Sequence, residues 1–159
     1  MTSTGETTDT QDFPPATVQL NLEVVTIAVS DVDRAKGFYR SLGWRLDADI
    51  AAGDSFRVVQ LTPPHSQCSV AFGKGVTTAP PGSAQRLLLV VSDITAARDE
   101  LVSRGIDVGE IYHLDGGPKP GLDPQGRPYM NHANFGDPDG NGWVLQEVKT
   151  RLPGRVWDA

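Results

Sequence analysis

Two stretches of the sequence decide the fold: VTIAVSDVDRAKGFYRSLG at residues 25–43 and LLLVVSDITAARDELVSRG at residues 87–105. Each begins with aliphatic and β-branched residues typical of a strand, passes through Ser-Asp, and continues with apolar residues spaced as on one face of a helix. A glycine ends each helix. Asp31 and Asp93 are 62 residues apart, as are the two closing glycines, so the stretches align without a gap. The chain therefore contains an internal duplication.

Three further extended pieces follow each helix, which gives both halves the order βαβββ. The strands that we expect span residues 22–29, 45–49, 56–61 and 68–72 in the first half, and 87–91, 107–113, 129–135 and 143–148 in the second. One helix covers one apolar face of such a sheet and leaves the other face for a different contact. We therefore predict an α+β protein in which two tandem βαβββ repeats form a curved mixed sheet round a cleft.

Composition divides the chain into modules and tails. The N-terminal residues are rich in Thr, Ser, Asp and Gln, with too few apolar side chains to pack, which predicts disorder. A Pro-Pro-Gly cluster at residues 80–82 marks a linker between the halves. The expected divisions are a disordered tail at 1–18, a first module at 19–76, a linker at 77–83, a second module at 84–149 and a C-terminal tail at 150–159.

Charge and hydropathy exclude several partners. The net charge is −6, and the 14 Lys and Arg residues are scattered along the chain. We therefore expect neither nucleic acid nor an anionic membrane as a partner. The longest apolar run, residues 87–91, is far below the roughly 20 residues of a membrane span, and the N-terminus does not have the pattern of a signal peptide. With Cys68 as its only cysteine, the chain is expected to be cytoplasmic.

A tight turn, Asp137-Pro138-Asp139-Gly140-Asn141, precedes the last expected strand. In such a turn Pro fixes φ, Asp accepts hydrogen bonds and Gly tolerates a positive φ. Together with Val-Ser-Asp-Val-Asp-Arg-Ala-Lys-Gly-Phe-Tyr at residues 29–39 and the duplication, this turn resembles the vicinal oxygen chelate superfamily of glyoxalases, bleomycin resistance proteins and dioxygenases. The resemblance covers about residues 20–150 and implies a homodimer that binds a small molecule, although activities within the family range from isomerases to drug-sequestering proteins.

The resemblance also implies where a metal would be held. In metal-using members, one ligand lies seven residues before the Asp that opens each helix, and another lies four residues after the Gly of the Asp-Pro-Asp-Gly turn. These positions are Val24, Arg86 and Val144, and the fourth falls near Ser69. Valine offers no donor atom, and the permanent charge of arginine repels a cation. We therefore expect no bound metal and no other cofactor.

Strand alternation from these positions predicts the side chains that face the cleft. The predicted ligand-binding residues are Thr26, Ser69, Arg86, Leu88, Asn134, Val144 and Gln146. Because the surroundings are largely apolar or neutral, the guanidinium of Arg86 needs an anion, either a carboxylate of the protein or one on a ligand. The alternative is that Arg86 pairs internally or lies at a frayed strand start.

Three other features have both a functional and a structural interpretation. His132 shares a strand face with Asn134, so it is a candidate catalytic acid-base group beside Arg86, or else a satisfied structural histidine. Glu147 points to the opposite strand face and is expected to be exposed or at an interface. The Pro- and Gly-rich segment 114–128 is expected to be a lid or a binding loop.

Three functions fit these observations. The first is metal-independent binding of a small organic molecule, anionic or aromatic, in an apolar cleft. The second is a metal-free isomerase, lyase or cyclase in which Arg86 stabilises an enolate-like anion and His132 moves a proton. The third, a metal-dependent glyoxalase or dioxygenase, requires a different strand register. The missing metal ligands favour the first, and the sequence leaves open whether the protein is an enzyme.

Overall fold

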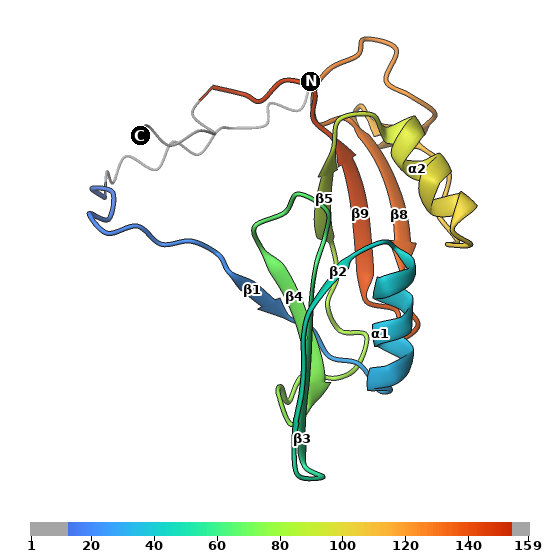
Figure 1. The fold of residues 1–159 in the computed structure, drawn as a ribbon. Coiled ribbons are helices and arrows are strands. Elements are labelled where there is room, and N and C mark those ends of the chain that lie inside the picture. Colours follow the sequence, from blue (N-terminus) through green and yellow to red (C-terminus); the bar gives the residue numbers. More distant parts are fainter. Residues whose placement is uncertain (1–12, 154–159) are drawn as a thin grey trace.

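The computed structural model describes residues 13–153. The parts of the two predicted tails at residues 1–12 and 154–159 lie outside the described residues. Each half of the described chain forms a mixed sheet with one helix on one of its faces (Figure 1). This arrangement confirms the predicted α+β class and the two βαβββ repeats.

The first repeat contributes a four-stranded sheet. Its elements are β1 (Val24–Thr26), α1 (Val32–Ser41), β2 (Arg45–Ala52), β3 (Phe56–Thr62) and β4 (Ser69–Lys74). The strand order is β1-β4-β3-β2, with β1 parallel to β4 and the other neighbours antiparallel. β1 is therefore an edge strand. Its ladder is shorter than the strand expected at residues 22–29, and it starts only at Val24 because its partner β4 begins at Ser69.

The second repeat has the same order of elements with one strand added. Its elements are β5 (Leu87–Val91), α2 (Ile94–Ser103), β6 (Tyr112–Leu114), β7 (Pro118–Pro120), β8 (Asn131–Gly136) and β9 (Gly142–Glu147). The strand order is β5-β9-β8-β6-β7, with β5 parallel to β9. Both helices have 10 residues, and within the described chain no helix has the length and apolar character to cross a membrane.

The two helices begin as the duplicated sequence predicts. Asp31 Oδ1 accepts a hydrogen bond from Arg34 N at 2.9 Å, and Asp93 Oδ1 accepts one from Ala96 N at 3.0 Å. Each Asp thereby satisfies a backbone N–H that has no partner within its helix. The glycine after each helix has a positive φ, 84° and 85°, which lets the chain turn away toward the next segment.

One predicted strand is mostly irregular in the structure. The strand expected at residues 107–113 forms a ladder only from Tyr112 onward. Before that point, the guanidinium of Arg98 on α2 donates hydrogen bonds to the carbonyl groups of Val108 and Gly109. Because a side chain satisfies these carbonyl groups, the segment needs no neighbouring strand.

The segment 114–128 is more regular than predicted. It contains β7, which pairs with β6 in an antiparallel hairpin. Pro118 and Pro120 are tolerated there because β7 lies at the edge of its sheet and needs no N–H on its outer side. The later part of the segment is fixed by Asp123, whose buried carboxylate accepts a hydrogen bond from Arg127 Nε at 2.9 Å. The Arg127 guanidinium holds the pKa of Asp123 well below its usual range.

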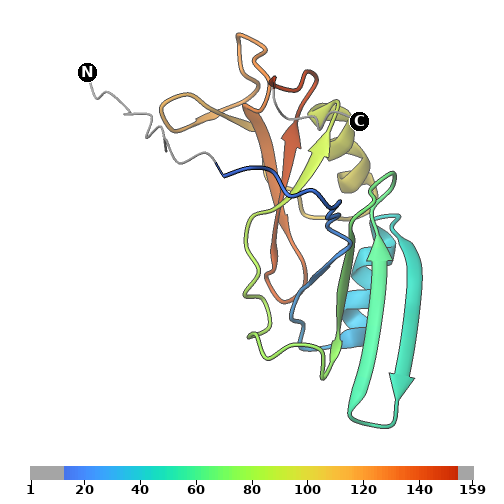
Figure 2. The same cartoon turned by 90° about the vertical axis from the view of Figure 1, so that its left-hand side faces the viewer.

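The two sheets present their uncovered faces in one direction. Each helix lies behind its own sheet in Figure 2, so this view looks onto the faces that neither helix covers. The helix sides of both sheets share one core, in which the ring of Trp143 lies 5.1 Å from that of Trp44 and 6.0 Å from that of Tyr39. No ladder joins the two sheets in the described part of the chain, so side chains hold the repeats together.

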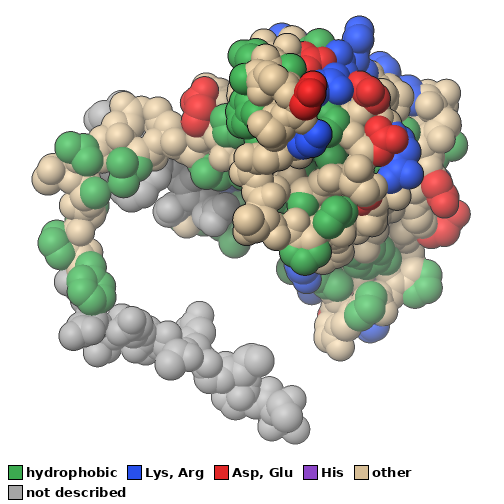
Figure 3. All heavy atoms as spheres, turned by 90° about the horizontal axis from the view of Figure 1, so that it is seen from below, with side chains coloured by type: hydrophobic (Ala, Val, Ile, Leu, Met, Phe, Trp, Pro, Cys, Tyr) green, Lys and Arg blue, Asp and Glu red, His purple; other side chains and the backbone are tan. Residues whose placement is uncertain are grey.

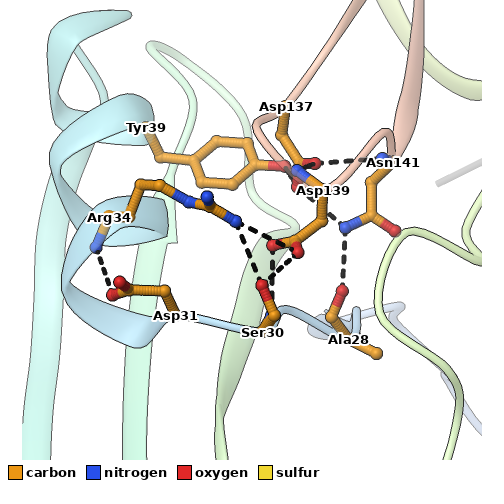
Figure 4. Close-up of polar contacts among 8 residues, drawn as sticks. All are labelled: Ala28, Ser30, Asp31, Arg34, Tyr39, Asp137, Asp139 and Asn141. Atoms are coloured by element: carbon orange, nitrogen blue, oxygen red, sulfur yellow. Dashed lines mark hydrogen bonds and ion pairs between the residues drawn. The ribbon is translucent and has the colours of Figure 1, made fainter.

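A buried hydrogen-bond network ties the second repeat to the first (Figure 4). Asn141 Nδ2 donates to Ala28 O at 2.9 Å and to Asp137 Oδ2 at 2.8 Å. Tyr39 Oη donates to the same carboxylate oxygen at 2.8 Å and accepts a hydrogen bond from Trp143 Nε1 at 3.0 Å. Burial and the neighbouring carboxylate of Asp137 raise the pKa of Tyr39, so its hydroxyl stays protonated and remains a donor. We call these five residues the inter-repeat network.

The tip of the same turn makes a second, more exposed contact. Asp139 Oδ2 accepts a hydrogen bond from Ser30 N at 3.1 Å, and Asp139 Oδ1 accepts one from the Ser30 hydroxyl. The guanidinium of Arg34 lies 3.3 Å from Asp139 Oδ1 (Figure 4). The two motifs that carried the resemblance, at the first helix opening and at the last turn, are therefore in contact.

Removal of one hydroxyl tests the inter-repeat network. In Tyr39→Phe, the buried Asp137 carboxylate loses a donor and Trp143 Nε1 loses its acceptor, so the free energy of unfolding should fall by about 1–3 kcal/mol. Tyr112→Phe is the matched control, because the Tyr112 hydroxyl donates to Asn134 Oδ1 at an exposed position. Urea unfolding followed by tryptophan fluorescence measures both variants. Equal losses in the two variants would contradict the assignment.

Candidate functional site

The uncovered face of the second sheet carries most of the predicted site residues. Side chains of residues paired across a ladder lie on the same face. Leu88 on β5 pairs with Val144 on β9. Gln146 on β9 pairs with His132 on β8. We call this surface the open face; its residues are Leu88, Val90, Tyr112, His132, Asn134, Val144 and Gln146.

Two predicted ligand-binding residues lie elsewhere. Thr26 and Ser69 belong to the uncovered face of the first sheet, where Thr26 pairs with Ala71. Ser69 is buried, and its hydroxyl lies 2.6 Å from that of Thr62. The structure therefore brings the other predicted ligand-binding residues together on or beside the open face, and leaves these two on a separate sheet.

The β5 side of the open face is apolar and partly exposed. Leu88 and Val90 are each 48% exposed, although they lie in the middle of a strand. Val144 beside them is buried. Aliphatic side chains left half exposed to water on this edge strand are unfavourable, and covering them with an apolar surface lowers the free energy. This part of the face can therefore bind an apolar body.

The polar side of the open face is centred on His132, whose two ring nitrogens are both engaged. Nδ1 lies 2.7 Å from Met130 O, which can only accept, so Nδ1 carries the proton. Nε2 therefore accepts, and Gln146 Nε2 donates to it at 3.2 Å. The Tyr112 ring stacks on the imidazole with 5.4 Å between centroids. Burial lowers the pKa of His132, the hydrogen bond to Met130 O opposes this shift, and the charge of Arg86 adds a smaller lowering.

Arg86 stands at the start of β5 in a strained backbone conformation. Its φ is 59°, a left-handed value that costs a residue other than glycine about 1–2 kcal/mol. Its side chain is exposed, and within residues 13–153 it makes no ion pair and no side-chain hydrogen bond. The alternative that Arg86 pairs internally therefore finds no partner in the described chain. An uncompensated guanidinium beside an apolar surface can bind an anion.

A second strained residue borders the same face. Tyr129, just before β8, has a φ of 68°, and its carbonyl oxygen accepts a hydrogen bond from Gln146 Nε2 at 3.1 Å. Tyr129 and Arg86 thus hold left-handed conformations at two sides of one surface. Backbone strain of this kind is found at functional sites more often than elsewhere.

The positions of the family's metal ligands lack donor atoms. They are occupied by Val24, Arg86 and Val144, and the strand register places Ala71 rather than Ser69 at the position that corresponds to Val144. Two valines, an alanine and an arginine do not fit a divalent cation. Elsewhere in residues 13–153, no group of three or more His, Cys, Asp or Glu side chains could hold a metal ion.

Glu147 is a partly buried helix cap, so the prediction of an exposed side chain was wrong. Its side chain is only 12% exposed. Oε2 accepts a hydrogen bond from Ile94 N at 2.9 Å, and Oε1 accepts one from Asn131 Nδ2 at 3.2 Å. Strand alternation placed the side chain on the correct face. It did not indicate that the first turn of α2 lies there with free N–H groups.

A cavity that the sequence did not indicate lies on the helix side of the second sheet. Its volume is about 220 Å³. Trp44, the Pro63-Pro64 turn and Leu101 of α2 form its walls, and none of the predicted ligand-binding residues lines it. Because both repeats contribute walls, no local sequence pattern could have revealed it.

The fold of this chain consists of two βαβββ repeats that are in contact through an Asp-Pro-Asp-Gly-Asn turn, and this combination is typical of one superfamily. The model of the Glyoxalase/Bleomycin resistance protein/Dioxygenase superfamily matches residues 21–145 of this chain. The chain belongs to this superfamily, which confirms the resemblance found in the sequence.

Two solved structures are similar to this chain over most of its length. One is TnmS3, an antibiotic binding protein from Streptomyces sp. CB03234, with 30% identity, a TM-score of 0.65, and coverage of 84% of this chain and 99% of that chain. The other is a member of the same superfamily from Sphaerobacter thermophilus DSM 20745, with 30% identity, a TM-score of 0.62, and coverage of 81% and 98%. A comparison with curated proteins finds no significant match.

The titration of His132 tests the arrangement of the open face. Its pKa, measured by NMR of the imidazole, should lie below the ordinary value of about 6.5 because the ring is buried, with a smaller contribution from the charge of Arg86. In Arg86→Gln the pKa should rise, because a nearby positive charge is removed. Arg45→Gln is the control, since Arg45 is an exposed residue of the first sheet.

The lowered pKa of His132 makes the stability of the protein depend on pH. The folded protein binds a proton at His132 less readily than the unfolded chain does, so stability should fall as the pH drops below about 6.5. His132→Gln should remove this part of the pH dependence. An unchanged pKa of His132 in Arg86→Gln would contradict the proximity of the two side chains.

Proposed function

We propose that this protein binds a small organic molecule that combines an apolar, aromatic body with an acidic group. The observation that carries the proposal is Arg86, exposed, strained and without an ionic partner in the described chain, beside the half-exposed Leu88 and Val90. The guanidinium binds the acidic group in a charge-assisted, bidentate manner. The aliphatic side chains bind the apolar body.

The hydrogen bonds of His132 favour binding over catalysis. A general base needs a free lone pair within reach of the proton that it removes. The lone pair of His132 Nε2 already accepts from Gln146, and its Nδ1 proton is donated to Met130 O. His132 therefore supports the site as a fixed, neutral ring that orients Gln146. A metal-free enzyme would need this pair to separate before any proton transfer.

A similar protein adds support for the ligand class. TnmS3 is described as an antibiotic binding protein, and it shares 30% identity with this chain over nearly its full length. Many antibiotics are aromatic and carry acidic groups, which is the chemistry that Arg86 and the apolar strip of the open face would recognise. We therefore propose that the ligand is an antibiotic-like aromatic acid and that the protein sequesters it.

We also propose that the protein is a cytoplasmic homodimer. Both uncovered sheet faces point the same way, and both carry exposed aliphatic side chains, such as Leu88 on the second sheet and Ile50 on the first. A single chain leaves these faces in water. A second copy would cover part of this surface and convert each shallow face into a deeper cleft.

Arg86→Gly tests the anion site without loss of fold. Binding is measured by calorimetry with aromatic carboxylic acid antibiotics and their methyl esters as probes. Wild-type protein should bind the acids, and affinity should fall by about tenfold or more both in Arg86→Gly and for the esters. The free energy of unfolding should not decrease, because glycine accepts the left-handed backbone that strains arginine.

Arg45→Gln is again the matched control, and it should bind the acids as the wild type does. Equal affinity for acids and esters, or full binding by Arg86→Gly, would contradict the anion site. A marked loss of stability in Arg86→Gly would show that the arginine has a structural partner.

The metal content of the purified protein tests the proposal that ligand binding needs no metal. The residues at the ligand positions predict well below one metal ion per chain after purification, measured by elemental analysis. Treatment with EDTA should leave the thermal midpoint unchanged, because no metal contributes to the folded state. One equivalent of nickel, zinc or iron per chain would overturn this part of the proposal.

A further inference from the structure

The cavity on the helix side of the second sheet lies where the two repeats meet. The first repeat contributes Trp44 and the Pro63-Pro64 turn, and the second contributes residues of α2, β5 and β9. Its inner walls are buried, since Trp44 is 7% and Leu145 is 2% exposed. Its mouth reaches solvent, because Pro64 and Glu100 are exposed. A small molecule can therefore enter this cavity, which we call the junction pocket.

The size of the junction pocket limits its occupant. An apolar protein cavity of about 150 Å³ binds benzene. The volume of the junction pocket is about 220 Å³. It therefore suits a flat molecule of about two fused rings.

The walls of the pocket favour an aromatic molecule. Trp44 and Phe135 contribute aromatic rings, and Leu89, Leu101 and Leu145 contribute aliphatic surface. Contacts between aromatic rings are favourable beyond the burial of apolar area. A flat ring system therefore gains more in this pocket than an aliphatic molecule of the same size.

The charges around the pocket favour a neutral molecule. Among the described residues that line it, Glu100 carries the one charge, and its Oε1 accepts a hydrogen bond from the Arg104 guanidinium at 3.1 Å. On the surface seen in Figure 3, acidic and basic side chains are intermixed, without a large patch of one sign. Within residues 13–153 the pocket therefore has no uncompensated charge for an ionic ligand, in contrast with Arg86 at the open face.

The free edge of β5 adds polar groups to the pocket. Val91 O accepts a hydrogen bond from Val148 N at 2.9 Å, so the backbone of Val91 faces β9. Backbone groups of successive strand residues point to opposite sides, so the N–H and C=O of Val90 point toward the free edge. Val90 lines the pocket, although its side chain lies on the open face. A nitrogen or oxygen atom of a ring system can therefore form a hydrogen bond with the main chain of Val90.

The turn at the mouth of the pocket is rigid and strained. Ser66 N donates to Pro63 O at 3.1 Å, which closes a tight turn with Pro64 and His65 at its centre. Proline fixes its own φ, and His65 has a φ of 64°, a value for which turns usually have glycine. Backbone strain of this kind is found at functional sites more often than elsewhere. The turn therefore provides a preformed rim.

We propose that the junction pocket is a second binding site, which takes a neutral heteroaromatic molecule of about the size of indole. The ring contacts Trp44 of the first repeat and Leu101 of α2, and its heteroatom forms a hydrogen bond with the main chain of Val90. This site goes beyond the proposed function, because its ligand carries no acidic group and contacts no side chain of the open face. Since both repeats contact the ligand, its binding stabilises the contact between them.

A substitution that fills the pocket tests the proposal. Indole is titrated into the full chain and binding is measured by calorimetry. Ala97 lines the pocket, so Ala97→Leu should weaken the binding of indole by at least about tenfold. Ala96→Leu is the matched control, because Ala96 is the exposed neighbour on the same helix, and it should bind indole as the wild type does. At about ten times its dissociation constant, indole should raise the thermal midpoint of the wild type by about 3 °C.

Leucine methyl NMR of the wild-type chain shows where indole binds. The methyl resonances of Leu89 and Leu101 should shift, because both residues line the pocket. Those of Leu88, on the other face of β5, should stay nearly unchanged. This measurement needs no substitution, so it decides the question even if Ala97→Leu does not fold. Shifts at Leu88 without shifts at Leu89 would contradict the second site.

Further results separate this site from the anion site of the open face. Arg86→Gly should bind indole as the wild type does, since Arg86 does not line the pocket. Loss of indole binding in that variant would assign indole to the open face and overturn the second site alone. A wild-type protein that binds no indole up to its solubility limit, or a folded Ala97→Leu variant with wild-type affinity, would also overturn the second site and leave the anion site untouched.

Discussion

The hydroxyl group of Tyr39 joins two halves of the molecule that no backbone ladder connects. It donates to Asp137 and accepts from Trp143, both of which belong to the second repeat, while Tyr39 itself belongs to the first. Each partner is buried, so a lost bond leaves a polar group without water. This contact, the bond from Asn141 to Ala28 O and the bonds of Ser30 to Asp139 hold the two repeats in one relative orientation, so polar contacts remote from the candidate site help to fix the direction of the uncovered faces.

Periodicity and duplication were sufficient to predict most of the fold. The 62-residue repeat predicted both helices, both Asp caps and the order βαβββ, because each of these is decided by residues close together in sequence. The segment at 107–113 and the cap at Glu147 could not be predicted in the same way. In both, a polar group is satisfied by a side chain from a distant element, as Arg98 satisfies the carbonyl of Val108. Such partners follow from packing rather than from a local pattern.

The placement of the candidate site residues on the sheets was predictable to a similar extent. Strand alternation correctly placed Leu88, Val144 and Gln146 on one face, since the period of two holds wherever a strand forms. Alternation could not show that Thr26 lies on a separate sheet, because that depends on how the repeats meet. It also could not show that both nitrogens of His132 are engaged. A hydrogen bond to the carbonyl of Met130 requires the backbone conformation and not only the residue types.

The two prolines of β7 determine how far the second sheet can grow. Pro118 and Pro120 have no N–H, so a further strand cannot form a full ladder on that side, and β5 is the other edge of the sheet. The outer strand of the first sheet, β2, is also protected, by the register shift next to Asp47 and by its charged side chains. Molecules with two receptive ends can join into fibres without limit. In the described chain only β1 and β5 keep unblocked outer edges, so edge-to-edge growth is limited to these two strands.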